Sequence, residues 1–325
     1  MVTVIMLLRV TFFHAVLSFP TNPSMLRKES KRYLQADDPQ DMNSRRDAMR
    51  AVFGILSLTP LLPSQQASAK VLQTKDGEIF DIPQGIGNYP AIIYQPRSSS
   101  GSGTKKKLPV LVVIHGAGTN EMDVWNLANP SGEHAGLAPS LLASGNAPSS
   151  LSENFIVIAP YSIGRRSFYE EPRRKLLDFI DWVCSIDGGG KNGIDTDRID
   201  PKQLFLFGFS DGATLGVELL TTGKFAGGII AAYGFTGTLP PLAIERLKDI
   251  PIWVFHSKDD VIFPVTCSDR LVTSLQKANS DKSIVKYTRF DQDQEGFTGS
   301  VRGHSTGITA TRTPDVYQWI LAIIN

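Results

Sequence analysis

A serine flanked by glycines is the first group in this sequence with the chemistry of a nucleophile. Ser210 lies in "GFSDG", between Gly208 and Gly212, where the apolar run 204–207 meets the helical apolar spacing of residues 214–220. The G-x-S-x-G spacing is typical of a sharp turn from a strand into a helix, where the neighbours of the serine must be small. A serine hydroxyl attacks only when a base removes its proton, so the sequence must also supply a histidine and an orienting carboxylate.

A carboxylate and a histidine follow Ser210 at spacings that fit such a set. "VFHSKDDVIFPV" carries Asp259 and Asp260, and "RGHSTG" carries His304. With Asp260 as the acid, the steps along the chain are 50 residues (260−210) and 44 residues (304−260), each close to one strand, helix and strand. Asp259 stays open as an alternative acid. His256 directly follows a strand-like run and precedes both aspartates, so we expect it to have a structural role and not that of the base.

The turn after another apolar run offers hydrogen-bond donors for a developing negative charge. In "VVIHGAG", a small, glycine-rich turn follows the run, and its backbone N–H groups can converge on one oxygen atom. We expect Ala117, or alternatively Gly118, to contribute one N–H group and Asp211 to contribute the other. The imidazole of His115 is expected to brace this turn, and His134 is expected to be exposed to solvent. Glycine after a strand is more often only a turn, so the motif gains its weight from "GFSDG" downstream.

Apolar runs alternate with helical patterns from Lys70 onward, and no internal repeat interrupts them. Near-continuous apolar strands separated by helices predict one α/β domain, residues 70–325, with a mainly parallel sheet, helices on both faces and no clear cap domain. Functional residues of such sheets gather at the carboxyl ends of the strands. Segment 119–154 either lies over the active face or connects two strands around the surface. The expected strands are 91–96, 110–116, 155–161, 204–209, 227–234, 250–256 and 285–290, and the expected helices are 171–186, 211–221, 265–278 and 314–324.

The same segments carry a resemblance to a known family. From about Val71 to its end, the chain resembles the alpha/beta-hydrolases of the esterase and predicted-peptidase branch, and is similar to polyhydroxybutyrate depolymerases, feruloyl esterases and acyl-protein thioesterases. "HSKDDVIFP" resembles that family's H-G-x-x-D-x-x-V-P segment, with Asp260 as its acid. "HSTGITATRTPDVYQWILAI" resembles the segment in which the catalytic histidine precedes a C-terminal helix. Two small residues depart from the pattern: Ser257 replaces a glycine, and Ala213 stands where a second glycine is common.

The resemblance implies a role for each member of the set. Ser210 would attack an acyl carbonyl, His304 would take its proton and return it to the leaving group, and Asp260 would orient the imidazole. The backbone N–H groups named above would hold the oxyanion, and water would then release the acyl group without a metal or an organic cofactor. The implied function is the hydrolysis of a carboxylic ester or thioester in a small-molecule or lipid-like substrate.

Three other functions stay open on the same fold. A serine peptidase shares the chemistry of the set, and a catalytically silent binding protein would be expected to have lost its serine, aspartate or histidine. A lipase would need an exposed apolar lid, whereas residues 126–145 are only mildly apolar. The candidate pocket residues are the aromatic side chains Trp125, Phe168, Tyr169, Phe263 and Phe297, together with Arg165 and Arg166 for a substrate carboxylate.

Composition narrows the class of protein. The formal net charge is +1, so electrostatics give no case for nucleic acid as a partner. The 325 residues include 42% hydrophobic residues, ample for one large core. Two cysteines are too few for a disulfide framework, and we expect Cys184 to be a buried thiol. We expect no stable membrane span in the mature chain, and the sequence leaves the oligomeric state open.

The first 69 residues have the features of targeting signals instead of a fold. "MVTVIMLLRVTFFHAVLSFP" predicts a signal peptide, and a basic spacer follows it. The next segment has paired Arg45 and Arg46, an apolar core at 51–62 and an A-x-A cleavage signal at 67–69. This series resembles targeting to the thylakoid lumen in algae with complex plastids, with a mature chain that begins near Lys70. Alternatives are secretion, an endomembrane lumen, or an amphipathic anchor that stays attached.

Overall fold

The computed structural model of the chain describes residues 70–83, 85, 89–98, 105–117, 122–162, 168, 172–279, 281–296 and 298–324. These residues all belong to one compact unit, Ala67–Asn325. The expected targeting region, residues 1–69, lies outside the described residues, so its boundary with the catalytic domain stays a prediction.

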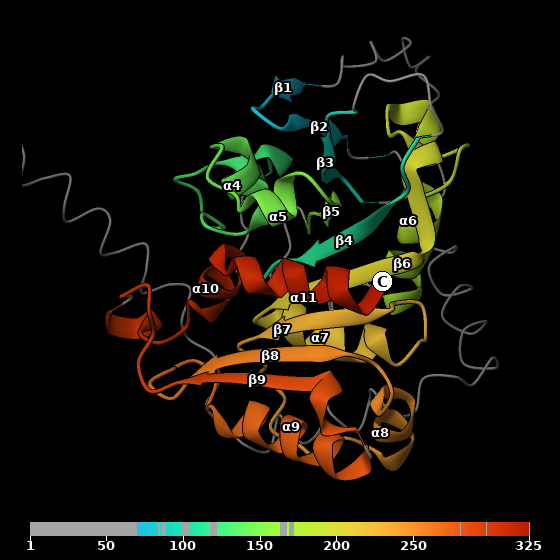
Figure 1. Ribbon diagram of the computed structural model, residues 1–325. Helices are drawn as coiled ribbons and strands as arrows, with labels where there is room; N and C mark the ends of the chain where they lie inside the picture. Colours follow the sequence, from blue (N-terminus) through green and yellow to red (C-terminus); the bar gives the residue numbers. More distant parts are fainter. Residues whose placement is uncertain are drawn as a thin grey trace, which may run out of the picture. The chain divides into compact units, whose positions relative to one another are not determined.

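Nine strands in the described part of the chain form a single mixed sheet, in the order β1-β2-β3-β5-β4-β6-β7-β8-β9 (Figure 1). The pairs β1–β2, β2–β3 and β3–β5 are antiparallel, and every pair from β5 across to β9 is parallel. The predicted mainly parallel sheet is confirmed, with an antiparallel edge added. The strands are β1 (Val71–Gln73), β2 (Gly77–Ile82), β3 (Ala91–Pro96), β4 (Leu108–Ile114), β5 (Ile156–Pro160), β6 (Ile199–Phe209), β7 (Gly227–Ala231), β8 (Ile252–Ser257) and β9 (Val285–Phe290).

Strand β4 explains why the central strands are apolar along their whole length. Val110, Val112 and Ile114 belong to the hydrophobic core on one face of the sheet, and Leu111 and Val113 belong to the core on the other face. Strands β5 and β6 flank β4, and all of its residues are buried. A strand without an exposed face has no reason to alternate apolar with polar residues.

Helices cover both faces of the sheet, as predicted. Buried side chains of α6, α7, α8 and α9 belong to one core, and those of α4, α5, α10 and α11 belong to the other. In Figure 1, α11 crosses in front of the strands and α7 lies behind them. The helices are α4 (Ala138–Ala143), α5 (Ser149–Ser152), α6 (Arg173–Val183), α7 (Asp211–Leu220), α8 (Pro241–Leu247), α9 (Thr266–Ala278), α10 (Thr306–Arg312) and α11 (Pro314–Ile324), with the 3-10 turns η1 (Val124–Ala128), η3 (Gly190–Asn192), η4 (Thr196–Arg198), η5 (Lys282–Ile284) and η6 (Gly299–Val301).

The chain between β4 and β5 is part of the hydrophobic core. Leu127 of η1, Leu142 of α4 and Leu151 of α5 are all buried on the face of the sheet that α11 covers. The described residues of this segment are therefore more than a surface connection. His134, which we expected to be exposed, is only 5% exposed, and its ring centroid lies 4.5 Å from that of His115. The expectation was wrong because the ring of His115 and the surrounding core cover a residue whose neighbours in sequence are small and polar.

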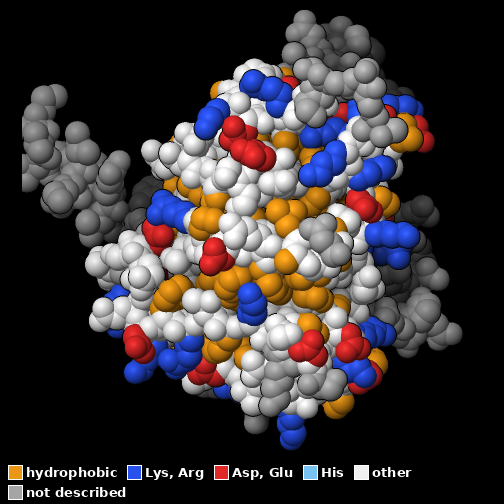
Figure 2. Space-filling view, viewed as in Figure 1, with side chains coloured by type: hydrophobic (Ala, Val, Ile, Leu, Met, Phe, Trp, Pro, Cys, Tyr) orange, Lys and Arg blue, Asp and Glu red, His pale blue; other side chains and the backbone are white. Residues whose placement is uncertain are grey.

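The helices and the surface charge of the described residues bear on the expectations from composition. Among the helices that the structure describes, none combines the length and the apolar character that a membrane span requires. Lys and Arg side chains are interspersed with Asp and Glu on the face shown in Figure 2, and no single basic surface dominates it.

Cys184 and Cys267 are both free thiols. Cys184 is only partly buried by its exposed area, although burial of the thiol still raises its pKa to about 12.

Candidate active site

Ser210 is the single residue that connects β6 to α7, at a sharp turn. Strand β6 ends at Phe209 and α7 begins at Asp211, while Ser210 has φ 57° and ψ −121°, in a region that non-glycine residues rarely occupy. A Cβ atom at Gly208 would lie 2.4 Å from the carbonyl oxygen of Gly212, so the turn requires glycine there. The sharp turn that the G-x-S-x-G spacing predicted is confirmed, and it presents the serine at the carboxyl end of β6.

The end of β4 lies directly against this turn. A Cβ at Gly212 would lie 2.2 Å from the carbonyl oxygen of Ile114, and a Cβ at Gly116 would lie 3.0 Å from the Cβ of Ser210. The two glycines therefore let the turn after β4 approach the serine. Ala117 is exposed in that turn, whereas Gly118 lies outside the described residues.

The first turn of α7 adds a favourable field at the serine. Because α7 begins at Asp211, directly after Ser210, the positive end of its dipole faces the point where negative charge would develop. Asp211 and Ala117 thus lie on the two turns that meet at Ser210, and their role as oxyanion donors stays a prediction.

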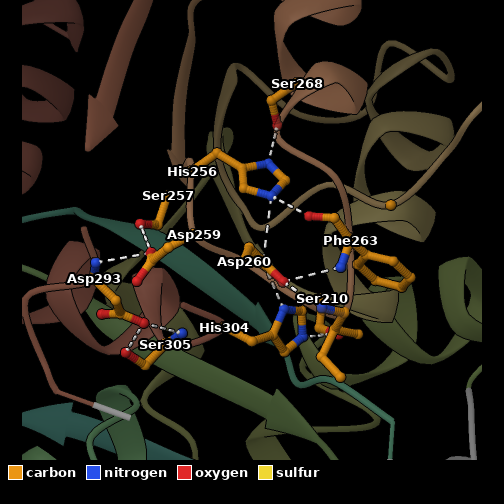
Figure 3. A network of polar contacts seen from close by, with 12 residues as sticks. Ser210, His256, Ser257, Asp259, Asp260, Phe263, Ser268, Asp293, His304 and Ser305 are labelled. Atoms are coloured by element: carbon orange, nitrogen blue, oxygen red, sulfur yellow. Dashed lines mark hydrogen bonds and ion pairs between the residues drawn. The ribbon is translucent and has the colours of Figure 1, made fainter. Parts of the chain in front are cut away.

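Two hydrogen bonds join Ser210, His304 and Asp260 (Figure 3). The Nε2 atom of His304 lies 2.9 Å from the Oγ atom of Ser210, and its Nδ1 atom lies 2.8 Å from Oδ2 of Asp260. Asp260 follows β8 and His304 follows β9, so both side chains come from the same edge of the sheet as Ser210. Because the carboxylate only accepts, Nδ1 of His304 donates to Asp260, which leaves Nε2 to accept from the serine hydroxyl.

The Asp260 carboxylate is held on both of its oxygen atoms. Oδ1 accepts from the backbone N–H groups of Ile262 at 2.8 Å and Phe263 at 2.9 Å, and Oδ2 meets His304 and also Nε2 of His256, at 3.3 Å. Burial raises the pKa of Asp260, but the hydrogen bonds from His256 and His304 outweigh it and leave the pKa at about 2. Since the folded pKa lies below the unfolded value, the resulting stabilisation is present above pH 4 or so and is lost as pH falls through about 2.

Asp259, the alternative acid, points away from the imidazole (Figure 3). Its Oδ1 accepts from the hydroxyl of Ser257 and from the backbone N–H of Asp293, at 3.1 Å. Oδ2 of Asp293 accepts in turn from the backbone N–H of Ser305, at 2.7 Å, and from its hydroxyl. Asp259 therefore ties the β8 loop to the residue that follows His304, whereas Asp260 holds the imidazole itself.

Gly303 lets the His304 loop lie on the backbone of the two aspartates. It has φ +76°, and a Cβ atom there would lie 2.3 Å from the carbonyl carbon of Asp259 and from the nitrogen of Asp260. We expect Gly303→Ala to lower the free energy of unfolding by about 2 kcal/mol and to lower kcat as well, because a strained residue and a backbone clash both displace His304. Urea unfolding and ester turnover measure the two effects.

Gly299 supplies a matched control for that substitution. It also has a positive φ, +65°, but nothing lies within 4 Å of a Cβ built there. Gly299→Ala is expected to cost about 1 kcal/mol in stability and to leave kcat near that of the wild type. Equal losses of kcat in the two variants would contradict the role assigned to the contact at Gly303.

Aromatic rings enclose the imidazole of His304. The ring centroid of Phe209 lies 5.3 Å from it, and that of Phe263 lies 5.5 Å from it in an edge-on arrangement. Phe263 was among the expected pocket residues, whereas Phe209 was not singled out. Trp125 instead donates to Asp81 and packs beside β3, and the ring centroid of Phe168 lies 4.7 Å from that of His115, with the two rings tilted. The remaining candidates, Tyr169, Phe297, Arg165 and Arg166, lie outside the described residues.

His115 braces the ends of β4 and β5, which confirms its expected role. Its Nδ1 donates to the carbonyl oxygen of Gly116 at 2.6 Å, and its Nε2 accepts from the backbone N–H of Ser162 at 3.2 Å. Complete burial lowers the pKa of His115 to about 4, so the ring is neutral at physiological pH and can keep both bonds. The turn that carries Ala117 is thereby fixed relative to the next strand.

Part of the chain matches the sequence profile of a known protein family. Residues 182–296 match the sequence profile of the Phospholipase/Carboxylesterase family. This match includes Ser210 and Asp260, and His304 follows its end. Among curated protein sequences, none matches the chain significantly.

Three solved structures illustrate the similarity of the fold. A thermostable esterase aligns with a TM-score of 0.52 at 21% identity, over 76% of this chain and 63% of the esterase, so the chain spans less than two thirds of that protein. A putative dienelactone hydrolase from Klebsiella pneumoniae aligns with a TM-score of 0.47 at 14% identity, over 78% of this chain and 97% of its own. A ferulic acid esterase aligns with a TM-score of 0.48 at 14% identity, over 78% of this chain and 98% of its own.

The sheet order, the helices on both faces and the serine at the β6–α7 turn give this chain the alpha/beta-hydrolase fold. The matched segment, residues 182–296, makes this part of the chain similar to the Phospholipase/Carboxylesterase family, and this similarity supports ester hydrolysis.

Proposed function

We propose that this protein hydrolyses carboxylic esters or thioesters through an acyl-enzyme on Ser210. The observation that carries the proposal is the unbroken line of contacts from Ser210 Oγ through His304 to Asp260, with distances of 2.9 Å and 2.8 Å. A silent binding protein has no need of this geometry, or of the rare backbone conformation that Ser210 adopts.

The reaction begins when Ser210 Oγ attacks the acyl carbon and its proton moves to Nε2 of His304. The carbonyl electrons move onto the oxygen, and the N–H groups of Asp211 and of Ala117 or Gly118 stabilise the resulting charge. When the intermediate collapses, the bond to the leaving group breaks, and His304 gives its proton to the departing alkoxide or thiolate. Asp260 keeps the imidazole oriented and stabilises its charged form throughout.

Water completes the cycle by the same steps in the same site. His304 takes a proton from a water molecule as its oxygen attacks the acyl carbon, and a second tetrahedral intermediate forms. Its collapse breaks the bond to Ser210 Oγ, and His304 returns the proton to the serine. The free carboxylic acid leaves, and the protein returns to its starting state.

A lipase with an apolar lid is less well supported than an esterase. The leucine side chains of residues 126–145 are buried, and Leu127, Leu137 and Leu142 belong to the core. A lid must instead expose such side chains when it opens, so this segment is an unsuitable lid.

Ester preference is tested with matched leaving groups on the chain that begins at Lys70. We expect p-nitrophenyl esters and a thioester of the same acyl group to be hydrolysed at least about tenfold faster than the matching p-nitroanilide, a difference of about 1.4 kcal/mol in the barrier. The reason is that an alkoxide or thiolate leaves more readily than an amine. Faster cleavage of the anilide would favour the serine peptidase.

We also propose that the mature protein works in the thylakoid lumen. The support comes from the two export signals in series, with Arg45 and Arg46 before the second apolar core and the A-x-A site at 67–69. A C-terminally tagged protein is expected in the thylakoid fraction, protected from added protease until the membrane is opened, with an N-terminus near Lys70. Recovery in the medium or in an endomembrane fraction would contradict this compartment.

A further inference from the structure

His256 is a buried histidine that the reaction described above does not use. It lies in β8, four residues before Asp260, and none of its surface is exposed. Its Nε2 atom lies 3.0 Å from the carbonyl oxygen of Phe263 and 3.3 Å from Oδ2 of Asp260. Its Nδ1 atom lies 2.7 Å from the hydroxyl of Ser268 on α9 (Figure 3).

These partners decide which nitrogen of His256 carries a proton. The carbonyl of Phe263 and the carboxylate of Asp260 can only accept hydrogen bonds, so Nε2 must carry the hydrogen that lies between them. The hydroxyl of Ser268 can donate, so Nδ1 can accept from it. Each nitrogen of this buried ring therefore has a partner, as burial of a polar group requires.

Oδ2 of Asp260 thus lies between two imidazoles. His304 donates to it from one side and His256 from the other, while two backbone N–H groups hold Oδ1. We propose that His256 is a positioning residue of the reaction: its Nε2–H group fixes the Asp260 carboxylate against His304 and takes up part of the carboxylate's charge. This inference rests on the proposed function, since it concerns the same site.

Loss of the His256 hydrogen bond is expected to shift the pH profile of kcat/KM in one direction. The titratable groups that face Asp260 are His256 from β8, His304 from the loop before α10 and the buried thiol of Cys267 from α9, with Arg270 beyond the thiol. Because the bond from His256 lowers the pKa of Asp260, its removal raises that pKa. Because the proposed mechanism needs the ionised carboxylate, this change moves the acid limb of kcat/KM to higher pH.

The test compares three variants by their profiles of kcat/KM against pH for one p-nitrophenyl ester. His256→Phe keeps the ring volume without the donor, His256→Gln keeps an N–H group near the position of Nε2, and His134→Phe makes the same change in a buried histidine that is placed beside His115. We expect a loss of kcat on the order of tenfold in His256→Phe, because an orienting group acts through position. We expect its acid limb to move to higher pH, and the limbs of the other two variants to stay near that of the wild type.

Two results would overturn the inference. The first is a folded His256→Phe protein whose acid limb coincides with that of the wild type. The second is an equal displacement in His256→Phe and His134→Phe, which would mark a general effect of losing a buried histidine. Circular dichroism and thermal unfolding establish whether each variant is folded.

A measurement on the unchanged protein keeps the inference testable if the variants do not fold. In ¹⁵N-histidine NMR spectra of the chain from Lys70, the His256 resonances are expected to show a proton on Nε2 across the accessible pH range. A neutral ring with its proton on Nδ1 would contradict the bond to Asp260. If the wild-type protein has no turnover but shows Nε2–H, the proposed function fails and the contact between His256 and Asp260 is supported.

Discussion

Ser210→Ala is expected to lower kcat for a p-nitrophenyl ester by at least about 10⁴-fold, because the proposed acyl-enzyme forms on the hydroxyl that this substitution removes. The remaining turnover would come from binding and from the oxyanion donors, which do not depend on the hydroxyl. Initial rates under saturating substrate measure the effect.

A distant serine gives the matched control. Ser283 lies exposed on η5, where its hydroxyl donates to Asp281. Ser283→Ala is expected to keep the wild-type kcat. Turnover that survives in Ser210→Ala would mean that a different group attacks the substrate.

Asp260→Asn is expected to have the second large effect and to lower kcat by about 10³- to 10⁴-fold. The amide can present its N–H group to Nδ1 of His304, which favours the tautomer with the proton on Nε2 and leaves no acceptor for the serine hydroxyl. The substitution also removes the negative charge that stabilises the imidazolium ion. The volume of the side chain hardly changes, so the loss reports on charge and tautomer.

The neighbouring Asp259→Asn separates chemistry from architecture. Asp259 accepts from Ser257 and from the backbone of Asp293, and its effect on His304 passes through the position of Ser305. We expect Asp259→Asn to lower kcat by about tenfold or less. We also expect a lower free energy of unfolding, because the loop contacts are weakened. A larger loss of kcat in Asp259→Asn than in Asp260→Asn would reverse the assignment of the acid.

The central sheet could be predicted because its strands have no exposed face. The apolar run in β4 gives the element directly, and Gly208 and Ser210 at the end of its neighbour β6 mark the turn into α7. The antiparallel edge was harder to predict. Strand β1 has only three residues, all of them exposed, and β2 includes Glu78 and Asp81, so neither has the pattern of a core strand. The pairing of these two strands becomes visible only in the registers of β1 against β2 and of β2 against β3.

The three residues joined by hydrogen bonds at the site were easier to predict from the sequence than the residues that hold them in place. Ser210, Asp260 and His304 each follow a recognisable strand, so the parallel sheet brings them to one edge. The bond from Asp293 to Ser305 depends on how the chain folds back after β9, which no local pattern encodes. His256 offered a usable signal, since a histidine four residues before the acid can reach it across a tight turn, but its burial by α9 is a tertiary effect.

Family likeness and geometry support different parts of the account. The Phospholipase/Carboxylesterase match ends at residue 296, so it carries no information on His304. The contact between His304 and Ser210 adds the base. The thermostable esterase has a similar fold, and its identity of 21% leaves the choice of substrate to experiment.

The central claim, that Ser210 is a nucleophile activated by His304, is tested most directly by covalent labelling. The chain from Lys70 is treated with a fluorophosphonate probe at neutral pH, digested and sequenced by mass spectrometry, with a heat-unfolded sample as the control. We expect one adduct, at Ser210 on the peptide that contains "GFSDGA", in the folded sample alone. A folded protein that stays unlabelled, or that is labelled at another residue, would contradict it.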